Sequence, residues 1–319
     1  MRRVYSERVP LGRLAFDPVL SELRDRSIQL LAAVRPGEEN DALQLVHRAR
    51  SMQLSVGLWP MLGNDRGRWL NPDNTADFRA FIDALLATFE RSGDDPPFDT
   101  MVLDLEPPIR EVRAMLDGRL GEARAWLRRG LDSSEHQHLV ERLAQRGIES
   151  LAAVVPTVLL PGRAGRGWQR ALGTPVHDVP YDRVSPMLYT SLFEGYGLGV
   201  VRREDARDLL RRWATVSVDA LGERTSVSLG AVGVGALGDE QTYRDVAELA
   251  EDVAIVRAAG CDDLVLFDLS GALERAPVEG WLDALVAADA PPEPEVTRRA
   301  QALDSVARMT GVVLDVAGT

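Results

Sequence analysis

The sequence predicts a single (β/α)8 barrel, and three observations support this fold class. Short apolar, β-branched runs alternate with amphipathic helical stretches along most of the 319 residues, which is the pattern of βα units on a parallel sheet. The runs are almost continuously apolar, as at Leu264–Phe267, which indicates strands buried on both faces. No glycine-rich phosphate turn follows the first run, so an open nucleotide-binding sheet is disfavoured.

The expected strands follow from these runs in chain order. Seven are predicted at Ser27–Val34, Leu54–Leu62, Thr100–Glu106, Leu151–Leu159, Val184–Ser191, Ser226–Val234 and Leu264–Ser270. An eighth strand is expected in the polar N-terminal region, within Arg3–Pro10 or Arg13–Phe16. In a barrel of eight such units, the loops that follow the strands build the active face.

Helices are predicted where apolar residues recur at spacings of three and four. Such stripes run along Phe78–Phe89, Leu209–Val216 and Val246–Val256. Prolines from Pro291 onward break the pattern, so we expect the barrel to occupy residues 1–290 and a C-terminal appendage to occupy residues 291–319. Within it, a helix is expected near residues 295–309, followed by residues 311–316 as part of the appendage or as a ninth strand.

The composition excludes several function classes. The chain has no lysine, so its 37 basic residues are all arginine, and Schiff-base, pyridoxal-phosphate and P-loop chemistries lack the amine they need. A formal charge of −12 argues against nucleic acid or an anionic membrane as partner and favours uncharged or cationic ligands. No segment is long and apolar enough to span a membrane. Without a signal peptide, the protein is expected to be cytoplasmic or an exported protein whose signal was removed.

A metal or cofactor is not expected from the sequence. The single cysteine, Cys261, allows neither an intramolecular disulfide nor a multi-cysteine metal site, and it is expected to be buried at the start of a strand. The four histidines lie at His47, His136, His138 and His177, and none is placed to reach the active face of the predicted barrel. The oligomeric state is not indicated.

The segment Phe98–Pro108 carries the main candidate chemistry. Side chains two apart on a strand share a face, so Val102, Asp104 and Glu106 are predicted to point into the barrel, with Met101, Leu103 and Leu105 toward the helices. Two carboxylates in one partly dry pocket disfavour double ionisation, which raises the apparent pKa of one of them and keeps a proton available to a general acid. The alternative is a carboxylate pair held by arginines in an ion-pair network.

This segment resembles the Asp-x-x-Asp-x-Asp-x-Glu signature of family 18 glycoside hydrolases, the chitinases and related endo-N-acetylglucosaminidases. Asp99, Asp104 and Glu106 fall on the first, third and fourth signature positions, and Val102 replaces the second acid. The resemblance covers the barrel, about residues 1–290.

Two further segments support the resemblance. Ser185–Thr190 is similar to the family's Met-x-Tyr-Asp segment, with Met187 and Tyr189 in place and Thr190 in place of the acid. Near the last strand, Phe267 and Asp268 stand where the family commonly has a tryptophan floor.

The resemblance implies hydrolysis of glycans that contain N-acetylglucosamine, with the substrate's own acetamido group as nucleophile. Glu106 would protonate the glycosidic oxygen, Asp104 would orient the acetamido group, and the Tyr189 hydroxyl would hold its carbonyl oxygen. With Val102 in place of an acid, Asp104 loses a hydrogen-bonding partner that the family uses in catalysis.

Aromatic residues supply further candidates for sugar binding. Trp59 ends the third strand and Trp69 lies in the long loop after it, so either can stack on a sugar face, although Trp59 equally fits a core position. Trp126, Trp213 and Trp281 occupy helical stripes and are expected in the core.

Two alternatives to the hydrolase remain open. The first is a catalytically inactive, chitinase-like glycan-binding protein. The second is a sugar isomerase barrel with a divalent metal held by Asp104, Glu106 and Asp268.

Overall fold

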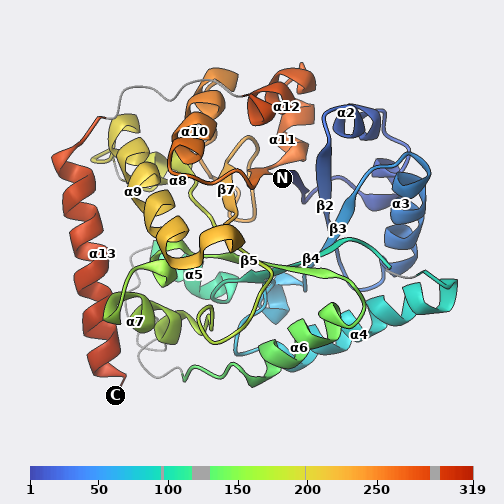
Figure 1. Ribbon diagram of the computed structural model, residues 1–319, viewed down its shortest axis with the longest axis horizontal. Coiled ribbons are helices and arrows are strands. Elements are labelled where there is room, and N and C mark those ends of the chain that lie inside the picture. The colour runs from blue at the N-terminus through green and yellow to red at the C-terminus, as the bar shows by residue number, and fades with distance from the viewer. Residues whose placement is uncertain (95–96, 117–129, 198, 288–294, 319) are drawn as a thin grey trace.

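Eight parallel strands form a barrel with the helices outside it, as predicted (Figure 1). The computed structural model describes residues 1–94, 97–116, 130–197, 199–287 and 295–318. Its strands are β1 Arg2–Ser6, β2 Ile28–Val34, β3 Val56–Pro60, β4 Thr100–Leu105, β5 Glu149–Val154, β6 Arg183–Pro186, β7 Val227–Gly230 and β8 Leu264–Phe267. Strand β1 confirms the first of the two positions expected for the N-terminal strand, Arg3–Pro10, and not Arg13–Phe16.

The strands hydrogen-bond in the order β6-β5-β4-β3-β2-β1-β8-β7. Single bridges, Val184 to Thr225 and Met187 to Ser228, connect β6 to β7 and nearly close the circle. All neighbours are parallel, so the carboxyl ends of the strands meet at one rim, where a barrel carries its functional loops.

Helices α1–α12 follow the strands. Their bounds are α1 Leu11–Leu14, α2 Val19–Asp25, α3 Glu39–Ser51, α4 Thr75–Ser92, α5 Ile109–Leu116, α6 Ser134–Ala144, α7 Arg163–Leu172, α8 Thr190–Gly195, α9 Arg203–Leu221, α10 Val246–Ala258, α11 Leu269–Glu274 and α12 Val278–Val286. The predicted stripe of α4 is buried against the sheet, and each of its Phe, Ile and Leu side chains contributes about 2 kcal/mol by leaving water. Helix α4 ends at Ser92 and is followed by Gly93, which adopts a left-handed φ of 83°.

The apolar side chains fall into two layers, as the alternation along β4 predicts. Met101 and Leu103 belong to the large core between the strands and the helices. Val102 belongs to a separate cluster inside the barrel, together with Leu31 and Leu151. The side of the barrel to which each β4 side chain points is therefore confirmed.

A polar layer fills the amino-terminal end of the barrel. Arg3 is 1% exposed and binds both Glu149, with Nη1 to Oε2 at 2.8 Å, and Asp263, with Nη2 to Oδ2 at 3.2 Å. Gln29 donates to the Thr100 hydroxyl at 2.9 Å, and that hydroxyl donates to Glu149 at 3.0 Å. Buried ions of opposite charge are thus paired, as burial requires.

Several predicted strands extend too far at their carboxyl ends. Strand β5 stops at Val154, and a 3-10 turn over Pro156–Leu159 carries the rest of the predicted run. Helices α8 and α11 begin inside the predicted strands that end at Ser191 and Ser270. An apolar run is buried in either conformation, so hydrophobicity alone does not mark the strand end.

The last helix, α13 (Arg298–Ala317), stands at one edge of the molecule against α7 and α9 (Figure 1). The ninth strand considered for residues 311–316 is wrong, because this segment continues the helix. The expected break at Pro291 lies outside the described residues. None of the described helices combines the length and the hydropathy of a membrane span.

Candidate functional site

A cavity of about 230 Å³ opens at the carboxyl ends of the strands. Most of the sequence-predicted site residues line it. The described lining includes Tyr5, Glu7, Trp59, Trp69, Asp104, Glu106, Met187, Tyr189, Glu240 and Phe267. The cavity therefore lies where a (β/α)8 barrel places a functional site.

Aromatic rings form its floor. The Tyr189 and Phe267 rings stack with centroids 5.6 Å apart at an interplanar angle of 22°. Trp59 meets Phe267 edge-on at 6.4 Å and lies 4.9 Å from the Tyr5 ring, centroid to centroid. Such a floor offers a dry, flat surface, and apolar faces of sugars or other rings are best desolvated against surfaces of this kind.

Asp104 and Glu106 stand together in the wall of this cavity. Burial raises the pKa of Glu106 to about 7, although a hydrogen bond with Asp104 and the charge of Arg68 oppose the rise. The pKa of Asp104 also lies well above its ordinary value, first because the group is buried and second because of the negative charge of Glu106. The pair therefore retains a proton near neutral pH, which is what a general acid requires.

The loop after β3 is attached to β4 beside the carboxylates. The Leu70 amide donates to the Asp104 carbonyl oxygen at 2.9 Å. Leu70 thereby forms an isolated parallel β-bridge with Leu105 at the end of β4. The loop brings Trp69 to the cavity and Arg68 to an ion pair with Glu7, which follows β1. Arg68 and Glu7 are 13% and 4% exposed, so their charges act on Asp104 and Glu106 through a poorly screened medium.

Three buried polar atoms of residues that line the cavity have no hydrogen-bond partner among the described residues, and one of them is the Tyr5 hydroxyl. The other two are Oδ1 of Asp104, an acceptor, and Nε1 of Trp59, a donor. Val102 lies in the apolar cluster inside the barrel and gives Asp104 nothing to bond. Unsatisfied buried polar groups cost free energy, so both atoms are suited to a ligand that supplies a donor and an acceptor.

Tyr189 faces the cavity while its neighbour Thr190 faces away. Burial, together with nearby acidic groups, raises the pKa of Tyr189 well above its ordinary value, so its hydroxyl remains a donor. Thr190 is fully buried, accepts a hydrogen bond from Arg203 Nη1 at 2.8 Å and donates to Asp252. Thr190 thus anchors the start of α8 and fixes the backbone that carries Tyr189.

The structure does not bring Asp99 or Asp268 to the cavity. Asp99 precedes β4 at the opposite end of the barrel, where its Oδ2 accepts from the Ser55 hydroxyl at 2.6 Å and the Val56 amide at 3.0 Å. Asp268 is fully buried as the N-cap of α11, and its Oδ1 accepts from the Gly271 amide at 3.0 Å. Both aspartates match the family pattern in the sequence, but in the structure each one accepts a hydrogen bond from a backbone amide and lies outside the cavity.

A metal site is not assembled from the described residues. No group of three or more His, Cys, Asp or Glu side chains among them is arranged to hold an ion. An isomerase site built from Asp104, Glu106 and Asp268 would need all three at one place, and Asp268 is absent from the cavity lining.

Sequence reasoning missed the acidic residues Glu7 and Glu240 of the lining. Glu7 follows β1, which lacks the apolar run that marks the other described strands, so the sequence did not place Glu7 at the end of a strand. Glu240 is 9% exposed, and its carboxylate accepts from the amides of Leu237 and Gly238 at 2.7 and 2.8 Å. The sequence feature that could have identified Glu240 is its place as an acidic residue in the glycine-rich loop after β7.

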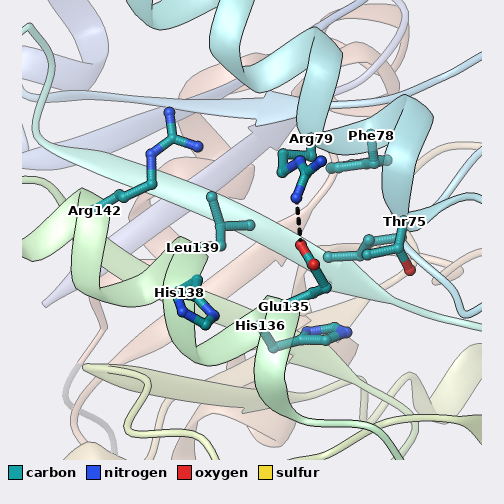
Figure 2. A pocket seen from close by; sticks show the side chains of 9 residues that line it. Thr75, Phe78, Arg79, Glu135, His136, His138, Leu139 and Arg142 are labelled. Atoms are coloured by element: carbon teal, nitrogen blue, oxygen red, sulfur yellow. Dashed lines mark hydrogen bonds and ion pairs between the residues drawn. The ribbon is translucent and has the colours of Figure 1, made fainter.

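A second cavity, of about 290 Å³, lies between α4 and α6 and shares no described lining residue with the first (Figure 2). Arg79 and Glu135 form an ion pair there at 2.9 Å, so their charges cancel. His136 is buried beside the Tyr181 hydroxyl, and burial lowers its pKa to about 4, which keeps the ring neutral. These residues hold α6 in place and leave the strand-end cavity as the candidate active site.

Known proteins similar to this chain were found by structure alone. The sequence matches no family model, and no curated protein matches it. The glycoside hydrolase domain of PgaB (BpsB) from Bordetella bronchiseptica is 15% identical, with a TM-score of 0.51, covering 89% of this chain and 98% of that one.

Two other similar structures are enzymes of different families. A variant of a family 18 chitinase from Cycas revoluta, solved with (GlcNAc)4, is 11% identical, with a TM-score of 0.50 and 90% and 99% coverage of this chain and that one. A GH5 cellulase from an Icelandic hot spring isolate is 13% identical, with a TM-score of 0.50 and 93% and 91% coverage. At these identities the likeness shows the (β/α)8 fold, which these glycoside hydrolases share with this chain.

Proposed function

We propose that this protein is a glycoside hydrolase related to family 18 that cleaves glycans containing N-acetylglucosamine. The observation that carries the proposal is the Asp104–Glu106 pair, with the pKa of Glu106 raised to about 7 above an aromatic floor. Such a pair supplies a proton to a glycosidic oxygen near neutral pH. The structural likeness to a chitinase solved with (GlcNAc)4 agrees with a substrate of this class.

The residues of the cavity divide the reaction between them. Glu106 protonates the leaving oxygen while the acetamido oxygen of the substrate attacks the anomeric carbon, giving a retaining, substrate-assisted reaction. Oδ1 of Asp104 accepts the acetamido N–H and stabilises the positive charge that develops on that group. The Tyr189 hydroxyl donates to the acetamido oxygen, and its raised pKa keeps that proton in place.

Sugar binding depends on the aromatic rings at the bottom of the cavity and on one hydrogen-bond donor. Phe267 and Trp59 present ring surfaces to the pyranose, and Trp59 Nε1 offers a hydrogen bond to a hydroxyl. Met187 lines the wall beside Tyr189. The rings are uncharged, so they accommodate an uncharged glycan.

The Glu106→Gln variant tests this proposal. Gln keeps the shape of the side chain but has no proton to donate, so release of product from N-acetylglucosamine oligomers should fall at least about 1,000-fold while affinity changes little. Glu141→Gln, an exposed carboxylate on α6, is the matched control and should retain full turnover. Unchanged turnover in Glu106→Gln removes this residue from the mechanism.

The departures from the family pattern favour one competing function, a glycan-binding protein without catalysis. Val102 and Thr190 stand where the family has acids, and the structure buries both away from the cavity. Under this reading the wild-type protein releases no product yet binds the oligomers, and Trp59→Ala or Tyr189→Phe weakens binding. Product release by the wild type, lost in Glu106→Gln, rejects it.

A further inference from the structure

The outer face of α13 is the main exposed apolar surface among the described residues. Of the twelve large apolar side chains that are well exposed, seven lie between residues 296 and 316. Six of these seven belong to the helix itself, with exposed fractions between 37% and 63%: Leu303, Val306, Met309, Val312, Val313 and Val316. Scattered exposed apolar residues are ordinary, but a concentration on one helix marks a contact surface.

The inner face of α13 is already fully engaged with the barrel. A Cβ on Gly167 of α7 would lie 1.8 Å from the Gly311 carbonyl oxygen, so the two helix backbones are in direct contact. Trp168 Nε1 donates to the Ala307 carbonyl oxygen at 2.9 Å, and Arg163 pairs with Asp315 at 2.8 Å. The helix is therefore held at the edge of the molecule (Figure 1), and its six exposed apolar side chains are left uncovered by the described residues.

The outer face has the spacing of a coiled-coil seam. Apolar residues recur at Ala302, Val306, Met309, Val313 and Val316, with steps of four, three, four and three. This 3.5-residue repeat is the narrow stripe by which one helix packs on another, and the flanking positions 303, 305, 310, 312 and 317 are also uncharged. The charged Asp304, Arg308 and Asp315 instead bond to the barrel or to each other.

We infer that α13 pairs with α13 of a second copy of this chain, antiparallel across a two-fold axis near Met309. About this residue the seam extends seven positions in each direction, so Ala302 meets the partner's Val316, and Val306 meets the partner's Val312 and the adjoining Val313. A face that is complementary to itself fits an isologous dimer.

Area and charge both favour the second copy as occupant. The six exposed side chains offer roughly 500 Å² in each subunit, or roughly 1,000 Å² in the pair, which is the lower bound expected of a biological interface. In a protein of charge −12, this uncharged stripe lets two copies meet without like-charge contact. The exposed Arg298 of one copy then lies near the carboxyl end of the partner helix, where the helix dipole favours a cation.

Sedimentation equilibrium of the full chain up to about 100 μM tests the inference. The wild type should be a dimer, and Val306→Glu should weaken association at least about 100-fold, since it places two carboxylates in an apolar seam. Gln301→Glu carries the same charge on the same helix outside the seam and should remain dimeric. A monomeric wild type, or a Val306→Glu variant that dimerises as the wild type does, overturns the inference.

Cysteine cross-linking tests the direction of pairing. Met309→Cys lies on the proposed axis and should form an intersubunit disulfide, because the native Cys261 is buried and does not compete. Val316→Cys is the control, since its two copies would stand about 20 Å apart in the antiparallel pair. Equal cross-linking of both variants, or cross-linking of neither, rejects the antiparallel two-fold.

Discussion

The raised pKa of Glu106 makes a prediction about stability that does not depend on any substrate. The carboxyl group ionises near pH 4.5 in the unfolded chain and near pH 7 in the folded protein. Between these values the folded protein binds the extra proton, so the free energy of unfolding contributed by this group falls as the pH rises from about 4.5 to about 7. The loss is nearly complete by about pH 8, one unit above the folded pKa.

The size of the effect follows from the shift. The rise in the pKa from 4.5 to about 7 lowers the free energy of unfolding by roughly 2–3 kcal/mol between pH 5 and pH 8, since one pKa unit is worth about 1.4 kcal/mol and this window covers most of the shift. Glu106→Gln does not ionise and escapes this loss. The negative charge of Glu106 also raises the pKa of Asp104, so its removal eases ionisation of Asp104 and adds to the effect in the same direction.

Urea unfolding at pH 5 and pH 8, followed by tryptophan fluorescence, measures the difference. The Glu106→Gln variant should gain roughly 2–3 kcal/mol over the wild type on going from pH 5 to pH 8. The exposed Glu141→Gln control should change by less than about 0.5 kcal/mol. An equal difference between Glu106→Gln and the wild type at both pH values refutes the raised pKa and the proton reservoir built on it.

Three further predictions follow from contacts in the barrel. In pH profiles of kcat/KM, the activity should fall above about pH 7 as Glu106 loses its proton, and Arg68→Gln should move that limb to higher pH because the Arg68 charge lowers the pKa of Glu106. Gly57→Ala should cost about 2 kcal/mol in urea unfolding, since its Cβ would lie 2.8 Å from the Thr100 carbonyl oxygen, whereas Gly12→Ala meets only Asp41 at 4.0 Å. Arg3→Met should lower the melting temperature by removing the buried partner of Glu149 and Asp263 and leaving them only Arg183, a loss of about 3 kcal/mol.

The elements of the barrel were predictable because their signals are local. Period-two alternation on β4 placed Val102 and Asp104 inside and Leu103 outside, and the structure agrees for each. The helical stripe of α4 was equally clear. The β-branched residues of 311–316 gave a false hint of a strand, because the close backbone contact between Gly311 and α7 outweighs local propensity.

The candidate site was predictable only where it lies on a strand. The position of Glu106 could be predicted because it lies at the end of β4. The Glu7–Arg68 ion pair joins two loops 61 residues apart, and no sequence spacing predicts such a pair. Asp99 and Asp268 fit a sequence pattern, yet each bonds to neighbouring backbone amides. A motif predicts which residue types are present. It does not predict where a side chain at a strand end points, because that depends on the hydrogen-bond donors and acceptors around it.

The polar layer around Arg3 has a consequence for how this barrel can change. Ion pairs among Arg3, Glu149 and Asp263 fix the alignment of β1, β5 and β8 at the amino-terminal end. The cavity is built at the other end, largely by loops. Exchange of the loops after β3 and β7 therefore leaves the strand alignment in place, so the chain can serve as a scaffold onto which loops with other binding preferences are grafted.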